Sequence, residues 1–75
     1  MKTYTPEQIG KLVKKTRRNL NVTQKELALA SGTGLRFIGE LEKGKPTCQL
    51  GKALAVLNTL GITLAMASPA TSRKE

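Results

Sequence analysis

Residues 23–44 read TQKELALASGTGLRFIGELEKG, and this stretch decides the fold because it holds two short helical patterns separated by a glycine. Thr23 and Glu26 have the spacing of a capping box, in which each side chain bonds the main-chain N–H of the other residue. The helix that they begin runs to Ser31, and Gly32 can adopt the positive φ that a tight turn between helices demands. The stretch therefore predicts a helix that starts at Thr23 and ends in a sharp turn.

The second pattern covers about residues 34–43, and Gly44 supplies a stop at its carboxyl end. Ile38 and Leu41 lie three residues apart and are expected to face the core, while Ala28 leaves room for a close helix crossing. Two short helices joined by a glycine-containing turn form a helix-turn-helix pattern. In that motif the second helix enters the major groove of DNA.

A longer amphipathic pattern precedes the motif and predicts a helix over residues 6–20. Thr5 stands at its N-cap, Pro6 occupies the first helical position, and Gln8 completes a second capping box. Its apolar face is predicted to hold Ile9, Leu12, Val13, Thr16 and Leu20, and its other faces hold Lys11, Lys14, Lys15 and Arg18.

A fourth helix is predicted over residues 47–60, from Thr47 after Pro46 to the residue before Gly61. Apolar residues recur there every three to four positions, as expected of a helix that closes a core. Its core-facing residues are predicted to be Leu50, Ala53, Leu54, Leu57 and Leu60. The predicted fold class is therefore all-α: a compact four-helix domain within residues 1–67.

Residues 62–67 alternate large apolar with small or polar side chains, a period of two that is typical of a strand. Nothing else in the chain resembles a strand, so its main-chain groups are expected to pair with the same segment of a second subunit. The alternative is an irregular tail that packs its Ile and Leu. The residues assigned to this dimer contact are Ile62, Thr63, Leu64, Ala65 and Met66. Residues 68–75 are polar and predict a disordered tail.

The composition favours a nucleic-acid partner. Thirteen Lys and Arg against five Glu give the 75-residue chain a net charge of +8. The chain has no His, and neither a catalytic group nor metal-ligand spacing is present, so we expect no enzymatic activity and no cofactor. Cys48, the single cysteine, is expected to be a small apolar residue. With no long apolar run, the protein is expected in the cytoplasm, at the nucleoid when bound to DNA, and not in a membrane.

The motif resembles the XRE/Cro-type, lambda-repressor-like DNA-binding domains of bacteria and phages. It shares TQxELA at residues 23–28, a glycine four residues later, Ile38, and LExG at residues 41–44. The flanking segments YTPEQI at residues 4–9 and LNTLGITL at residues 57–64 are similar to HipB-type antitoxins. The resemblance implies a homodimer with a carboxyl-terminal β element between subunits. By family position it also implies an ion pair between Arg17 and Glu42.

Docking of a helix-turn-helix places the reading residues at positions 34–40. Arg36 is the best candidate, because a guanidinium can bond guanine O6 and N7 together; its alternative is a phosphate contact. Leu35 and Phe37 either meet thymine methyl groups or cover the core. Gly34 and Gly39 stand where relatives carry polar residues, and Gly39 allows DNA or another helix to come close. The other residues assigned to the DNA surface are Glu40, within the reading segment, and Gln24, Lys25, Lys43 and Lys45, at the phosphate backbone.

The sequence therefore predicts a dimeric transcriptional repressor that binds palindromic operators in double-stranded DNA. The HipB resemblance implies in addition that it is the antitoxin of a HipA-like kinase toxin and represses its own operon. One alternative is a stand-alone XRE-type regulator without a toxin. The other is a protein-interaction module that neutralises a partner and contacts DNA only secondarily.

Overall fold

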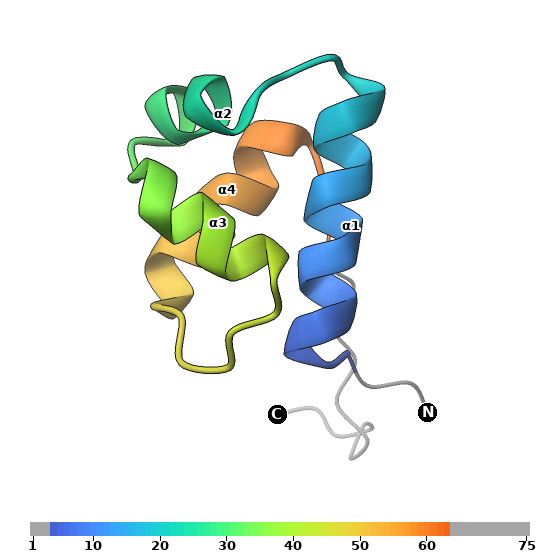
Figure 1. Ribbon diagram of the computed structural model, residues 1–75, viewed down its shortest axis with the longest axis vertical. Helices are drawn as coiled ribbons and strands as arrows, with labels where there is room; N and C mark the ends of the chain where they lie inside the picture. Colours follow the sequence, from blue (N-terminus) through green and yellow to red (C-terminus); the bar gives the residue numbers. More distant parts are fainter. Residues whose placement is uncertain (1–3, 64–75) are drawn as a thin grey trace, which may run out of the picture.

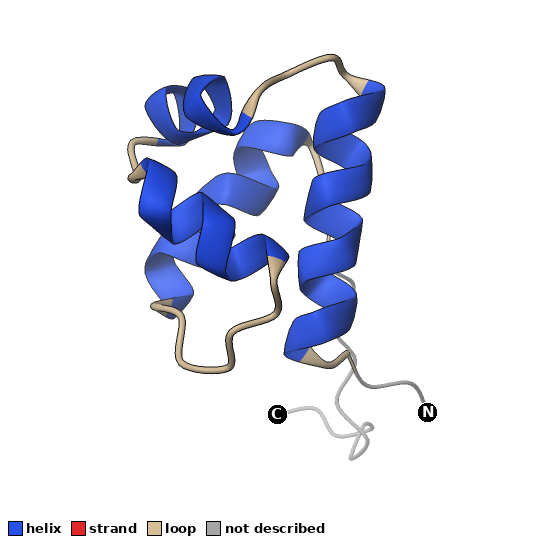
Figure 2. Ribbon diagram, viewed as in Figure 1, coloured by secondary structure: helices blue, strands red, loops and turns tan. Residues whose placement is uncertain are grey.

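The computed structural model describes residues 4–63, which form four α-helices joined by short loops (Figures 1 and 2). The helices are α1 (Pro6–Asn19), α2 (Gln24–Ser31), α3 (Leu35–Glu42) and α4 (Leu50–Leu60). In Figure 1, α1 and α3 lie side by side at the front, and α4 passes behind α3. The predicted all-α helix-turn-helix domain is confirmed. Residues 64–67 of the predicted strand lie outside the described residues, and Ile62 and Thr63 have no regular secondary structure.

Both predicted capping boxes are present at the helix starts. The Thr5 hydroxyl accepts the Gln8 N–H at 3.1 Å, and the Gln8 side chain accepts the Thr5 N–H at 3.0 Å. The corresponding distances for Thr23 and Glu26 are 3.0 and 2.8 Å. Gly32, with a φ of +71°, makes the left-handed turn that ends α2. These short-range interactions set the bounds of α1 and α2 where the sequence predicts them.

The end of α4 is a second left-handed turn, which folds the chain back onto the core. Gly61 has a φ of +76° and its N–H donates to the Asn58 carbonyl. The Ile62 N–H donates to the Leu57 carbonyl at 2.9 Å, which completes a Schellman motif. As a result Ile62 packs against the core.

One apolar core lies between the four helices. The residues with the least exposure are Val13, Ile38 and Val56, at 0%, and Leu27, at 1%. The other buried apolar residues are Ala28, Leu41, Leu57 and Leu60. Within residues 4–63, no helix is long and apolar enough to cross a membrane.

The structure corrects both the start and the buried face of α4. The helix begins at Leu50 with Gln49 as N-cap, because the residues from 46 to 49 form a turn and a link that packs Cys48 against the core. Periodicity predicts Leu50 and Leu54 in the core, but they are 71% and 43% exposed, whereas Val56 is fully buried. The helix carries two neighbouring apolar stripes, and packing against the other helices selects the one that contains Val56.

Gly10 is the point of closest approach between α1 and α3. A Cβ added there would clash with the Leu41 carbonyl oxygen and lie 2.8 Å from that of Glu42. The predicted buried face of α1 omits Gly10 and includes Leu12 and Leu20, which are 36% and 54% exposed. A glycine lacks the apolar signal on which periodicity depends, so the pattern alone does not reveal this contact.

The Gly10→Ala variant is expected to be less stable than the wild-type protein, because its new methyl group clashes with main-chain atoms that cannot rotate away. Overpacking of this kind costs about 1–3 kcal/mol, and 1 kcal/mol lowers the Tm of a domain this small by roughly 4–8 °C. Thermal unfolding followed by circular dichroism measures the difference. In the matched control, Gly51→Ala, no atom lies within 4 Å of the added Cβ, so its Tm should equal or exceed that of the wild type. A Gly10→Ala Tm equal to the wild-type value would contradict this account.

Candidate nucleic-acid interface

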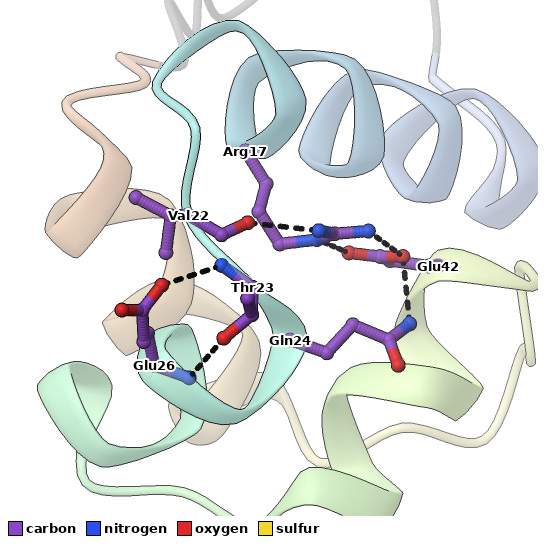
Figure 3. A network of polar contacts seen from close by, with 6 residues as sticks. All are labelled: Arg17, Val22, Thr23, Gln24, Glu26 and Glu42. Atoms are coloured by element: carbon purple, nitrogen blue, oxygen red, sulfur yellow. Dashed lines mark hydrogen bonds and ion pairs between the residues drawn. The ribbon is translucent and has the colours of Figure 1, made fainter.

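A buried ion pair between Arg17 and Glu42 joins α1 to the end of α3 (Figure 3). Arg17 Nε donates to Glu42 Oε2 at 2.6 Å, and Nη2 donates to Oε1 at 3.2 Å. The third nitrogen, Nη1, donates to the Val22 carbonyl at 2.8 Å. The two charged side chains are only 11% and 4% exposed. The pair implied by the family resemblance is therefore present, in a bidentate geometry that fixes both helices.

Gln24 extends this network to α2. Its side-chain amide donates to Glu42 Oε1 at 2.9 Å, so a single carboxylate holds residues from three helices together. The sequence predicts Gln24 at the phosphate backbone and gives no sign of this bond. No local pattern relates Gln24 to Glu42, which lies 18 residues further along the chain.

The electrostatics of the pair follow from its surroundings. Burial raises the pKa of the Glu42 carboxyl, but hydrogen bonds from Arg17 and Gln24 and the charges of Arg17 and Lys14 outweigh burial and lower the pKa below its usual value. The hydrogen bond to Glu42 likewise raises the pKa of the Arg17 guanidinium. The carboxylate is thus held charged, and removal of either partner would leave a buried charge uncompensated.

Acid is expected to weaken the fold through Glu42. Because the folded-state pKa is lowered, the stabilisation from Glu42 is complete above the unfolded-state pKa of about 4.3 and is lost as the pH falls through the folded-state value. Urea unfolding between pH 7 and pH 3 should show a falling free energy of unfolding. The Glu42→Gln variant should be less stable at pH 7 but lose less stability on acidification. If the free energy of unfolding fell equally with pH in the two proteins, Glu42 would have no part in the acid sensitivity.

The face of α3 opposite the core is open to solvent. Ile38 and Leu41 are buried, whereas the side chain of Arg36 is 92% exposed. Gly39, Glu40 and Lys43 follow Arg36 at helical spacing and so share its face, which we call the free face of α3. A second helix with a buried face and a free face meets the geometric requirement for insertion into the major groove.

Glu40 lies between two cations at this surface. Its Oε2 atom is 3.4 Å from Arg36 Nε and 3.3 Å from Lys45 Nζ. The hydrogen bond from Lys45, together with the charges of Lys45 and Arg36, lowers the pKa of the Glu40 carboxyl. Exposed ion pairs are weak, so Arg36 can leave Glu40 for a base edge or a phosphate.

The two apolar candidates on α3 differ in their surroundings. Phe37 is half-buried and packs against the core, and Lys52 Nζ lies 5.9 Å from the centroid of its ring. Of the two predicted alternatives for Phe37, the structure shows core packing. Leu35 is 52% exposed and belongs to neither the core nor its border, so its side chain is accessible to a ligand.

Gly34 and Gly39 contrast with Gly10 because nothing packs against them. Gly34 is the N-cap of α3 and provides no side-chain hydrogen bond there. No atom lies within 4 Å of a Cβ added at either Gly34 or Gly39. Within residues 4–63, packing against another helix therefore does not account for Gly39.

A polar hollow beside α3 includes residues that the sequence pattern did not reveal. Gln49 and Lys52, at the start of α4, line it together with Arg36 and Glu40. Local sequence gives no sign of this proximity, because it depends on how the start of α4 lies relative to α3. Lys25 and Lys43, both predicted at the phosphate backbone, are exposed. Among residues 4–63, no group of three His, Cys, Asp or Glu residues could hold a metal ion.

Comparisons with known proteins agree with this geometry. Residues 13–66 match the model of a helix-turn-helix family. An uncharacterized HTH-type transcriptional regulator, y4mF from Sinorhizobium fredii strain NGR234, is 51% identical over 70 residues, which cover 93% of this chain and 92% of the relative. Two similar solved structures are a complex of HipB with an O4 20-mer and a HipA–HipB–O2–O3 complex. Each has a TM-score of 0.79 and 25% identity, and the match covers 92% of this chain and 97% of the other.

The fold, the free face of α3 and these comparisons define a helix-turn-helix transcriptional regulator. The chain belongs to the XRE-type helix-turn-helix family.

Proposed function

We propose that the protein is a repressor that binds a palindromic operator as a homodimer. The observation that carries this proposal is the free face of α3, which the buried network of Arg17, Gln24 and Glu42 holds in a fixed orientation. Preorganisation of this kind lets a helix bind with little further loss of conformational entropy. The similarity to HipB in complexes that contain an O4 20-mer supports DNA as the ligand.

Within this surface, Arg36 is the base reader and Leu35 contacts a thymine methyl or a sugar. Gly39 allows the DNA to approach the main chain of α3, which agrees with the open space around it. The phosphate backbone is bound by Lys25, Lys43 and Lys45. Gln24 also contributes, through its polar groups that do not bond to Glu42. Glu40 releases Arg36 when DNA binds.

Dimerisation proceeds through residues 62–67, with Ile62 anchored by the Schellman turn at the end of α4. The described residues also carry an apolar surface that suits a protein partner. Tyr4, Leu50 and Leu54 are 58%, 71% and 43% exposed, and they line a common hollow of about 250 Å³ between α1 and α4. Two-fold symmetry of the dimer would match the two halves of a palindrome.

We extend the proposal to an antitoxin role toward a HipA-like kinase. Its support is the similarity to HipB, including HipB in a complex with HipA. A stand-alone regulator is the second candidate, because the 51% identical relative is named a transcriptional regulator with no mention of a toxin. Co-purification with the product of a neighbouring kinase-like gene supports the first candidate. The absence of such a gene favours the second.

The DNA proposal is tested by titrating the protein, at physiological salt, with DNA from upstream of its own gene. A scrambled duplex of equal length is the control. We expect a preference of about 10³-fold or more for the upstream DNA and protection of two half-sites about one helical turn apart. Equal and steeply salt-dependent binding to both duplexes would contradict the proposal, because charge alone would then account for binding.

Arg36→Ala is expected to lower operator affinity by roughly 5- to 150-fold, which corresponds to the about 1–3 kcal/mol that a bidentate base contact contributes. The same change should have a much smaller effect on binding to the scrambled duplex. Arg36→Lys keeps the charge but lacks the planar fork, so it should recover non-specific affinity more fully than specificity. Equal decreases in affinity for both duplexes would show that Arg36 contacts a phosphate.

A further inference from the structure

A row of cations on α1 lies outside the residues assigned to the DNA surface above. Lys11, Lys14, Lys15 and Arg18 recur at helical spacing and line one shallow hollow together with Asn19. Among residues 4–63, none of the four forms an ion pair with a carboxylate. Like charges at this spacing destabilise a helix, so the fold of α1 does not account for the row. We call these four residues the α1 basic row.

The contacts of α1 fix the direction in which this row points. Gly10 faces α3, and Ile9 lines the apolar hollow shared with α4. Successive residues of a helix turn by about 100°, which centres the row about 90° from Gly10 and nearly opposite Ile9. The row therefore faces away from α4.

The free face of α3 points away from the core, because Ile38 and Leu41 on its opposite side are buried. Figure 1 shows α1 and α3 side by side in front of α4, so the two surfaces belong to neighbouring helices. Lys43 is the exposed C-cap of α3 and follows Glu42, the residue that pairs with Arg17 of α1. Lys14 lies near enough for its charge to act on the Glu42 carboxylate.

We propose that the α1 basic row is a second DNA-backbone surface, which binds phosphates flanking the base pairs that α3 reads. This inference rests on the proposed DNA binding by α3. A regular row of cations suits the regular row of phosphates on a DNA strand. An acidic protein is a poorer fit, because protein interfaces normally include apolar anchors at their centre, and the row contains none.

The test compares the wild type with a triple variant, Lys11→Gln, Lys15→Gln and Arg18→Gln, which leaves Lys14 and the base-reading residues in place. Affinity for the operator is measured by fluorescence anisotropy over a range of salt concentrations, on a duplex trimmed to the operator and on a longer duplex with flanks. The variant with Lys11→Arg, Lys15→Arg and Arg18→Lys keeps every charge and is the matched control. Thermal unfolding checks that all three proteins fold.

For the triple glutamine variant we expect the slope of log K against log salt to become shallower by about 0.9 for each phosphate that the variant no longer neutralises. The ratio of the affinities for the longer and the trimmed duplex should be smaller than for the wild type. The preference for operator over a scrambled duplex of equal length should stay unchanged. The charge-preserving control should behave as the wild type.

Two results would overturn the inference while leaving the proposed function intact. One is an unchanged salt slope for the triple glutamine variant, which would show that the row does not touch DNA. The other is an equal decrease in affinity for the long and the trimmed duplexes, which would place the bound phosphates within the operator. A wild-type protein without preference for the operator would instead overturn the proposed function, on which the inference rests.

Discussion

The buried carboxylate of Glu42 is the interaction on which the arrangement of the helices depends. It accepts hydrogen bonds from Arg17 of α1 and Gln24 of α2, and it belongs itself to the last turn of α3. A carboxylate this far from water is stable only with its partners in place, so the three helices are held in a single relative orientation. The exposed side of α3, with Arg36, therefore has a fixed orientation as well. The side chains of Arg17 and Glu42 contribute to that orientation although they are themselves buried.

The glycines of this small domain show two different constraints. Gly10 is required by the packing of the domain itself, because main-chain oxygens of Leu41 and Glu42 occupy the place of its Cβ. Gly39 has open space around it, yet a glycine inside a helix costs about 1 kcal/mol relative to alanine. Among residues 4–63, packing against another helix does not account for Gly39. The open space around it agrees with the proposed approach of DNA to the main chain of α3, whereas Gly10 serves the packing of the domain.

How much of the structure could be predicted from the sequence depends on the range of the interactions involved. The capping boxes and the turn at Gly32 act over a few residues, and the structure confirms them. The pair of Arg17 and Glu42 was accessible only through family position, because its members are 25 residues apart. The prediction that Leu50 and Leu54 lie in the core is wrong, and it omits the buried Val56, because two apolar stripes on one helix satisfy the same periodicity. Only the positions of the other helices distinguish the two stripes, and this information is absent from local sequence.

The distribution of surface types bears on the choice between a DNA-binding regulator and a protein-interaction module. The free face of α3 carries the cations Arg36 and Lys43, and Leu35 on the same helix is an exposed large apolar residue. The exposed Leu50 and Leu54 belong to α4, which lies behind α3 in Figure 1. Protein interfaces concentrate apolar side chains at their centre, whereas DNA interfaces are polar and strongly positive. A protein partner seated on the α4 side would leave α3 free for DNA, so the two kinds of binding need not compete for one surface.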